Sequence, residues 1–310
     1  MTKLMKEPEE LPKGFSQPTA LPANKDEHRG WQDANRKWWE SHPMRYDWKG
    51  GIPFEEFSKE FFAEIDKRFF ELVELYAPCR KIPFDWLLDF DSLRAMDVLE
   101  IGIGNGSHAQ LLAEHAKSFT GIDLTEYAVR STSERMRVFG LAGTVLQMDA
   151  ERLQFPDNSF DLIWSWGVIH HSANTRKIIE EMHRVLRPGG EAIVMVYHRT
   201  FWEYYVQGAV LATLSGQIFR PGALHESIQR RTDGAIARYY RASEWRQLVS
   251  DLFMVKKIRI YGKKTEIVPL PAGKLKDGIL FMVPNSFSRF LTNRCRWGSF
   301  LVSTLVKKPR

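Results

Sequence analysis

The chain has 310 residues, of which 44% are hydrophobic and 26% charged, and its formal net charge is +6. It is long enough to bury a large core, and we expect one elaborated domain rather than two smaller ones. The longest apolar stretch, Val206 to Leu214, is too short to cross a bilayer, so no transmembrane segment is predicted. The first 15 residues alternate charge with proline and lack the apolar core of a secretion signal, which favours a soluble, cytoplasmic protein.

The two cysteines, Cys79 and Cys295, lie far apart, with no CxxC motif and no histidine at ligand spacing. Neither a disulfide framework nor a metal site is therefore predicted, and we expect two reduced thiols.

The positive charge is concentrated at the end of the chain. From Arg220 onward there are 19 Lys and Arg against 6 Asp and Glu. Such asymmetry indicates an anionic ligand, a membrane surface or nucleic acid, or only a solvated basic face. A membrane role would need an amphipathic helix, which this tail does not suggest, and a nucleic-acid partner is unlikely because no RNA-binding module is recognisable.

The first ninety residues divide into two parts. Residues 1–27 are rich in Pro, Glu and Lys, which predicts a disordered or weakly docked arm. Residues 28–90 are dense in aromatic side chains, and the spacing of Phe57, Phe61 and Ile65 predicts a helix with one apolar face. We expect this second part to form an N-terminal helical cap.

Residues 91–200 alternate short β-branched runs with amphipathic segments. The expected strands are AMDVLEIG (95–102), SFTGIDL (118–124), TVLQMD (144–149), FDLIWSWGVIHH (160–171) and GEAIVMVYHR (190–199). The expected helices are HAQLLAEHA (108–116), EYAVRSTSERMRVFG (126–140) and TRKIIEEMHRVLRPGG (175–190), the last stopped by Pro188 and the glycine pair. This alternation predicts an α/β fold with a doubly wound, mostly parallel, Rossmann-like sheet and places the cofactor-binding core here.

Residues 201–310 are expected to form a substrate-side addition. Residues 201–253 look helical and aromatic. VKKIRIYG (255–262) and GSFLVSTLVKK (298–308) are predicted as two late antiparallel edge strands.

A glycine-rich turn joins the first strand to the first helix of the core. Gly102, Gly104 and Gly106 let a ligand approach the backbone next to the positive end of a helix. A dinucleotide fingerprint would continue GxGxxG, but Ser107 follows Gly106, and Glu100 precedes the first glycine. The pattern therefore favours a cationic ligand over a pyrophosphate.

Two further acids end the next two strands. Asp123 lies 23 residues past Glu100 and could accept hydrogen bonds from both hydroxyls of a ribose. It could also only cap the following helix, a role open to Thr125 as well. Asp149 ends the third strand. Three acids at successive strand ends predict one nucleoside-binding crevice at the carboxyl edge of the sheet.

LEIGIGNG, GIDLT, MDAERLQF, FDLIWSWGVIHH and RVLRPGG together resemble the class I S-adenosylmethionine methyltransferases, in particular their ubiquinone/menaquinone-type (type 11) branch, over residues 95–197. The resemblance implies S-adenosyl-L-methionine as cofactor, with Glu100 and the glycine turn at its methionine portion and Asp123 at its ribose. The implied cofactor-binding set is Glu100, Gly102, Gly104, Gly106, Asp123, Leu124, Asp149, Ala150, Ser165, Trp166 and His170. A looser similarity to terpenoid and indole methyltransferases favours secondary metabolism.

The candidate catalytic groups lie near the same edge. His171, Tyr197 and His198 follow two of the strands, and a histidine there could accept a proton or only hydrogen-bond its loop. NRKWWESHPMRYDW resembles a leader that folds over the cofactor in such enzymes, so Tyr46 is either a ligand contact or part of the core. The candidate substrate-binding residues are Trp48, Arg199, Phe201, Arg238 and Tyr239.

The methyl acceptor is the least determined part. Aromatic residues suit an apolar body and the basic tail suits an anion, which favours a prenyl diphosphate methylated at carbon through a carbocation that could cyclise. The alternatives are N-, O- or S-methylation of an amino acid, quinone or phenol, a nucleic-acid methyltransferase, and a non-catalytic nucleotide-binding protein. The sequence leaves open the oligomeric state and any need for a general base or Mg.

Overall fold

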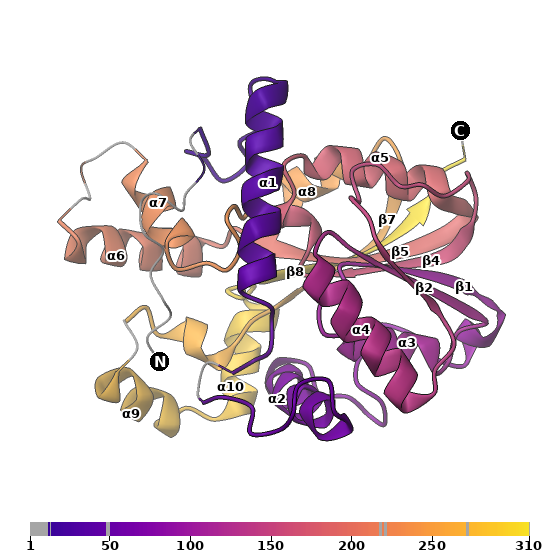
Figure 1. Ribbon diagram of the computed structural model, residues 1–310. Helices are drawn as coiled ribbons and strands as arrows, with labels where there is room; N and C mark the ends of the chain where they lie inside the picture. Colours follow the sequence, from indigo (N-terminus) through magenta and orange to yellow (C-terminus); the bar gives the residue numbers. More distant parts are fainter. Residues whose placement is uncertain are drawn as a thin grey trace.

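The computed structural model describes residues 12, 14–47, 50–216, 219, 222–270 and 273–309. A single mixed sheet forms its centre, with strand order β3-β2-β1-β4-β5-β8-β7 and the short β6 paired with β5 (Figure 1). The strands are β1 (Asp97–Ile101), β2 (Ser118–Asp123), β3 (Thr144–Gln147), β4 (Phe160–Trp166), β5 (Leu186–His198), β6 (Tyr239–Tyr240), β7 (Phe253–Tyr261) and β8 (Phe300–Lys307). The first five run parallel, which confirms the predicted doubly wound α/β fold.

Helices cover both faces of the sheet. They are α1 (Lys25–Ser41), α2 (Lys59–Tyr76), α3 (Ser107–Ala113), α4 (Glu126–Phe139), α5 (Thr175–Val185), α6 (Gly208–Leu214), α7 (Ala223–Gln229), α8 (Ala242–Val249), α9 (Lys274–Met282) and α10 (Asn285–Arg289). Short helical segments are η2 (Ser92–Ala95), η3 (Ile169–His171), η4 (Phe201–Gln207), η5 (Lys264–Ile267) and η6 (Phe290–Arg294). No helix in the described ranges is long and apolar enough to span a bilayer.

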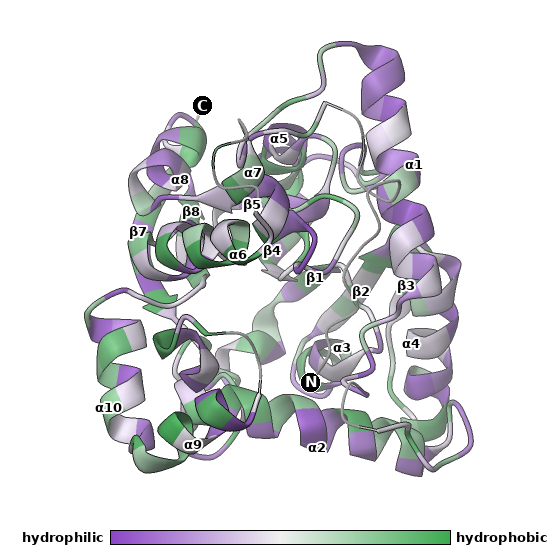
Figure 2. Cartoon of the chain, turned by 90° about the vertical axis from the view of Figure 1, so that its left-hand side faces the viewer, coloured by the Kyte–Doolittle hydropathy of each residue, from purple (hydrophilic) through white to green (hydrophobic). Residues whose placement is uncertain are grey.

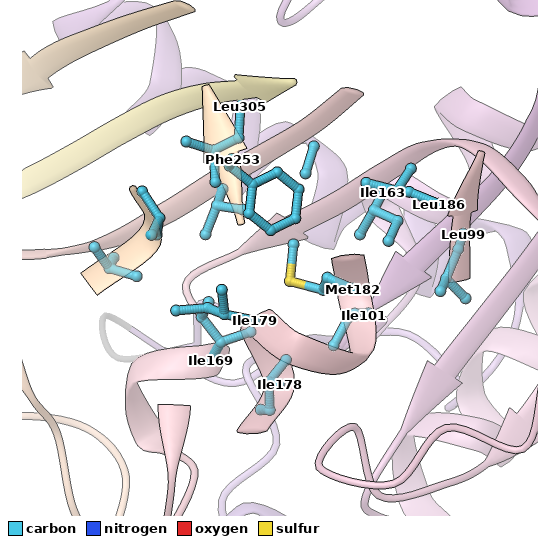
Figure 3. Close-up of a cluster of buried hydrophobic side chains, with 14 of the residues drawn as sticks. Leu99, Ile101, Ile163, Ile169, Ile178, Ile179, Met182, Leu186, Phe253 and Leu305 are labelled. Carbon is cyan, nitrogen blue, oxygen red and sulfur yellow. The ribbon is translucent and has the colours of Figure 1, made fainter. Parts of the chain in front are cut away.

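Two hydrophobic clusters hold these layers together. On one face, Met182 of α5 and Phe253 of β7 pack with Leu99 and Ile101 of β1 (Figure 3). On the other face, α2, α3 and α4 pack against side chains such as Trp164 of β4. Because alternate residues of a strand point to opposite faces, the continuous apolar runs of β1, β4 and β5 are buried on both sides.

The boundary between α5 and β5 differs from the expectation. The helix ends at Val185, and the strand already begins at Leu186, so Pro188 and the glycine pair belong to an irregular strand start. The pairing with β4 shifts register there. The residue before a proline disfavours the helical conformation, so the helix ends before Arg187 and not at the proline itself.

The two late strands are antiparallel, as expected, but only β7 is an edge. β8 lies between β5 and β7 and pairs antiparallel with both. Its residues Phe300 to Leu305 are all buried. An interior strand pairs on both sides and is buried on both faces. The sequence of β8 alone does not show which strands it pairs with, so it was expected at an edge.

Residues 14–24, a part of the 1–27 segment that was expected to be a disordered or weakly docked arm, contact the body of the protein. The Phe15 ring meets the buried Trp31 ring edge-on, with centroids 5.3 Å apart. The main-chain N–H of Tyr239 donates to the carbonyl of Pro18 (3.0 Å). Aromatic packing and a main-chain hydrogen bond thus tie the described part of this arm to α1 and to β6.

Candidate functional site

A cavity of about 270 Å³ lies at the carboxyl edge of the sheet. One half is bordered by the glycine turn after β1 and by the ends of β2 and β3. The other half is bordered by α2, the end of β4, and residues of β5 and β8. Of the expected cofactor-binding residues, the structure brings Gly102, Gly104, Asp123, Leu124, Asp149, Ala150 and Trp166 to the cavity wall.

The three glycines of the turn have different tasks. All have positive φ angles: 81° at Gly102, 53° at Gly104 and 80° at Gly106. A Cβ on Gly102 would lie 2.2 Å from a methyl group of Val168, whereas one on Gly104 would meet nothing within 4 Å. Gly102 is therefore required for packing, and Gly104 exposes its backbone to the cavity. Gly106 lies behind the wall and is the N-cap residue of α3.

Asp123 faces the cavity and also secures the turn. Its Oδ2 accepts from the N–H of Gly104 (3.3 Å), and its Oδ1 accepts from the N–H and hydroxyl of Thr125 (3.0 and 2.8 Å). Burial raises the pKa of the carboxyl, while these hydrogen bonds lower it. Thr125 caps α4 through the N–H of Ala128, so the capping role considered for Asp123 belongs to Thr125.

Helix α1 reaches the third acid. The side-chain amide of Gln32 donates to Oδ2 of Asp149 (2.9 Å), and its oxygen accepts from the N–H of Ala173 (3.0 Å). Gln32 and Asn35 both line the cavity. Helix α1 thus forms a wall of the cofactor-side half.

Glu100 lies behind the turn and not in the cavity wall. It is 1% exposed, its Oε1 is 3.7 Å from Nδ1 of His108, and its Oε2 has no hydrogen-bond partner. Burial and then the charge of Asp123 raise the pKa of Glu100, while Arg135 lowers it. Burial thus disfavours the ionised form of both carboxyls, and a positively charged ligand beside the turn would favour that form.

Ser165 and His170 also lie behind the wall. The Ser165 hydroxyl donates to the carbonyl of Ile101 (3.2 Å). His170 is fully buried, its ring centroid lies 4.0 Å from that of Tyr197, and neither ring nitrogen has a hydrogen-bond partner. Burial lowers the pKa of His170, so the ring is neutral.

These observations test whether the site suits S-adenosylmethionine. Gly104 leaves room at the backbone, Asp123 and Asp149 present carboxylates to the cavity, and Glu100 adds a buried acid with an unpartnered oxygen. A nucleoside with a positively charged substituent would find hydroxyl acceptors and charge compensation here. The residues present therefore fit this cofactor.

The other half of the cavity is mainly apolar. Its walls include Phe69, Leu72 and Val73 of α2, Met195 of β5 and Phe300 of β8. Polar groups are few among the described lining residues of this half, and the expected candidates His171, Tyr46 and Tyr197 are among them. Such a chamber suits a small molecule with an apolar body and a localised polar group.

His171 has a defined tautomer. Its Nδ1 lies 2.7 Å from the carbonyl oxygen of Ile236, which can only accept a hydrogen bond. Nδ1 therefore carries a proton, and in the neutral form of the ring the lone pair is on Nε2. The rings of Trp39 and Tyr197 meet it edge-on, at 5.1 and 5.5 Å between centroids.

Asp233 is a lining residue that the sequence analysis missed. Burial raises the pKa of both Tyr46 and Tyr197, and the nearby Asp233 charge raises each further. Both phenols are therefore protonated near neutral pH. Lys263 also lines the cavity, with Nζ 5.4 Å above the Phe300 ring. Neither residue belongs to a recognisable motif; the Asp-Gly pair at 233–234 signals only a turn.

Several expected acceptor-side residues do not reach the cavity. Nδ1 of His198 lies 2.9 Å from the carbonyl of Gly298. The hydroxyl of Tyr239 is hydrogen-bonded to Thr232 at 2.5 Å. Both side chains are held by partners behind the wall, so neither contacts this chamber.

The expected anion-binding arginines are occupied by the protein itself. Arg238 is buried and donates to the carbonyls of Ala20, Ser172 and Ala173. Arg199 is paired with Glu244. Among the remaining expectations, Phe201 is 76% exposed outside the cavity, and Trp48 lies outside the described residues.

Comparison with known proteins agrees with this geometry. Residues 99–194 match the family model described as "Methyltransferase domain". Phthiotriol/phenolphthiotriol dimycocerosates methyltransferase of Mycobacterium tuberculosis is 37% identical over 100 residues, 32% of this chain and 36% of that protein. The ubiquinone/menaquinone biosynthesis C-methyltransferase UbiE of Pseudoalteromonas translucida is 32% identical over 108 residues, 33% of this chain and 43% of that protein.

The matches are partial. The chain spans between about a third and a half of the length of the curated relatives it matches. The crystal structure of MccD protein superimposes with a TM-score of 0.50 and 17% identity over 73% of this chain and 96% of that chain, a likeness of fold. The family resemblance inferred from the motifs is thereby confirmed over the core.

Proposed function

We propose that this chain, whose residues 99–194 form a class I methyltransferase domain with S-adenosylmethionine as its cofactor, methylates a small acceptor with an apolar body and an ionisable hydroxyl. One observation carries the proposal. The same cavity that borders the glycine turn and Asp123 continues into an apolar chamber bordered by His171. Cofactor and acceptor can thus meet in one enclosed space.

The residues of the cofactor-side half would orient the cofactor. When bound, the cofactor supplies an electrophilic methyl group on a sulfonium. Asp123 and Asp149 would hold its nucleoside, and the exposed backbone of Gly104 would lie against its methionine portion. Alignment of acceptor and donor can supply several kcal/mol, about 7–11 in the best intramolecular cases.

His171 is the residue best suited to remove a proton from the acceptor. Because the carbonyl of Ile236 fixes the proton on Nδ1, the ring offers the Nε2 lone pair as a base. Tyr46 and Tyr197, which stay protonated near neutral pH, would donate hydrogen bonds to an acceptor oxygen. A base favours an acceptor that loses a proton, such as a phenol or a quinol.

A prenyl diphosphate, which the composition favoured, is less well supported. A diphosphate needs several cationic donors. Lys263 is the one Lys or Arg among the described lining residues. A nucleic-acid acceptor lacks support for a similar reason, because it would need a row of cations for its phosphates. The UbiE relative carries the name of a quinone pathway, which is consistent with a quinol-like acceptor.

The test is methyl transfer from radiolabelled S-adenosylmethionine to a panel of phenols, quinols, prenyl diphosphates, amino acids and bulk RNA. We expect organic-extractable label with phenols or quinols and background with the others. Label in a prenyl diphosphate, an amino acid or RNA would overturn the proposed acceptor class. A lack of transfer to any member, with cofactor bound, would reject the proposal of a small phenolic acceptor.

A further inference from the structure

The segment formed by α9, α10 and η6, residues 274–296, exposes large apolar side chains. Phe281 is 91% exposed, Met282 76% and Leu275 72%. Phe287 and Phe290 are half exposed. Single exposed apolar residues are ordinary, but a concentration of them on neighbouring turns marks an interaction surface. We call this the α9–η6 surface.

The opposite side of the same segment is anchored to the body of the protein. Lys276 and Leu280, one helical turn apart, are buried, and Nζ of Lys276 donates to the carbonyl of Leu270 (3.0 Å). The side-chain amide of Asn293 donates to the carbonyl of Tyr76 (2.8 Å). One side of the segment is therefore fixed to the protein, while the apolar side chains of the other side face solvent.

The charge of this segment is strongly positive. Residues 274–296 contain five Lys and Arg, and Asp277 is the single acid. Lys274, Arg294 and Arg296 are exposed, and none of them forms an ion pair with another described residue. Exposed apolar rings flanked by unpaired cations match the chemistry of an anionic bilayer surface, where rings enter the headgroup region and cations meet phosphates.

The sequence suggested no amphipathic helix in the basic tail. Val283 and Pro284 split the segment into two short helices, so neither shows a long apolar period.

The segment that carries the α9–η6 surface contacts a residue that lines the acceptor half of the cavity. Tyr76, whose carbonyl accepts from Asn293, lines that cavity. Lys263 and Phe300, which also line it, flank the segment in sequence. Figure 2 shows α9 and α10 beside α2, which borders that half of the cavity.

We propose that the α9–η6 surface binds the surface of an anionic phospholipid bilayer and thereby brings the acceptor half of the cavity next to lipid. Phe281 and Met282 enter the headgroup region, while Lys274 and Arg294 meet lipid phosphates. The inference goes beyond the proposed function and does not depend on it, because vesicle binding is measured without methyl transfer.

The test is co-sedimentation of the full chain with vesicles of phosphatidylcholine alone or with about one third phosphatidylglycerol. We expect binding to the anionic vesicles only, at least tenfold weaker for the double variant Phe281→Ser and Met282→Ser. The charge-reversal variant Lys274→Glu with Arg294→Glu should lose binding as well. The matched control Met254→Ser, at a 54% exposed position on β7, should bind like the unaltered protein.

Each variant is first checked for unaltered S-adenosylhomocysteine affinity, which shows that the core is folded. The proposal is wrong if the unaltered protein stays in the supernatant with anionic vesicles, or if both variants sediment as it does. Light scattering tests whether the surface instead binds a second copy of the chain. A dimer that Phe281→Ser and Met282→Ser convert to a monomer would mean that the surface joins two copies of the chain, which also overturns the proposal.

Discussion

Asp123 shows how one carboxylate can serve both the fold and a ligand. We expect Asp123→Asn to weaken binding of S-adenosylhomocysteine by about 1–3 kcal/mol, because a charged acceptor becomes neutral. The asparagine keeps one oxygen for the N–H of Thr125, so the fold should persist. Calorimetry measures the change, with Glu134→Gln, at a partly exposed position of α4 outside the cavity, as control. Equal affinity in the two variants would place the ribose elsewhere.

His171 is expected to act on the acceptor and not on the cofactor. His171→Asn keeps a donor near Nδ1 for the carbonyl of Ile236 but removes the Nε2 base. We expect turnover to fall by about 10²–10⁴-fold, the usual contribution of a general base. Affinity for S-adenosylhomocysteine should stay unchanged. Turnover within about twofold of the unaltered enzyme would remove His171 from the proton transfer.

Single residues were predictable where the strand pattern fixes their place. Asp123 and Asp149 follow strands of a parallel sheet, so their meeting at one edge follows from topology alone. His198 also follows a strand, but its ring turns to Gly298, which arrives 100 residues later in the chain. A contact with so distant a segment leaves no trace in local spacing. Asp233 was missed for the same reason.

Helix α1 closes the cofactor side through a buried anchor. Trp31 is 2% exposed and packs with Ala173 and Ile236. We expect Trp31→Ala to lower the free energy of unfolding by about 3–5 kcal/mol. It should also weaken S-adenosylhomocysteine binding, since Gln32 would no longer hold Asp149. Urea unfolding and calorimetry measure both effects, with exposed Lys37→Ala as control. Unchanged affinity would mean that α1 does not form the wall.

His225 of α7 makes the stability of the fold depend on pH. Burial lowers the pKa of His225 to about 3, whereas an unfolded histidine titrates near about 6.5. Between these values the unfolded chain binds the extra proton, so stability is full above about pH 6.5 and falls as the pH drops towards about 3.

His225→Asn removes this titration while leaving a partner for the Tyr204 hydroxyl, which now bonds to Nδ1 at 2.7 Å. Below about pH 6.5, the free energy of unfolding of the variant should fall less steeply with acid than that of the unaltered protein. The two slopes should differ by roughly 1 kcal/mol per pH unit. Chemical unfolding at pH 7, 6 and 5 measures the slope. Tyr204→Phe, which keeps the imidazole, should retain the original slope. If the free energy of unfolding of His225→Asn depends on pH as steeply as that of the unaltered protein, His225 is not the group responsible for the acid sensitivity.

The elements of the core were predictable because each has its own period and caps. The capping hydroxyl of Thr125 and the left-handed Gly140 bound α4 close to the predicted limits. The position of β8 was not predictable, because its insertion between β5 and β7 depends on tertiary contacts and not on its own sequence. The short helices α9 and α10 were missed because neither is long enough to show a period.

At the scale of the whole molecule, the two halves of the cavity have different origins. The cofactor half comes mostly from one continuous segment, the family-matched residues 99–194, and its sequence motifs identify it. The acceptor half joins α2 near the start of the chain to Phe300 near its end. Walls assembled from such distant segments carry no motif, so the acceptor could be inferred only from the assembled chamber.

The central claim is that the glycine turn, Asp123 and Asp149 hold an adenosyl sulfonium and not a dinucleotide. Isothermal titration calorimetry of the purified chain with S-adenosylhomocysteine and with NAD tests it most directly. We predict micromolar or tighter binding of S-adenosylhomocysteine, with Asp123→Asn weakening it, and no heat with NAD. Binding of NAD with no response to S-adenosylhomocysteine would contradict the account.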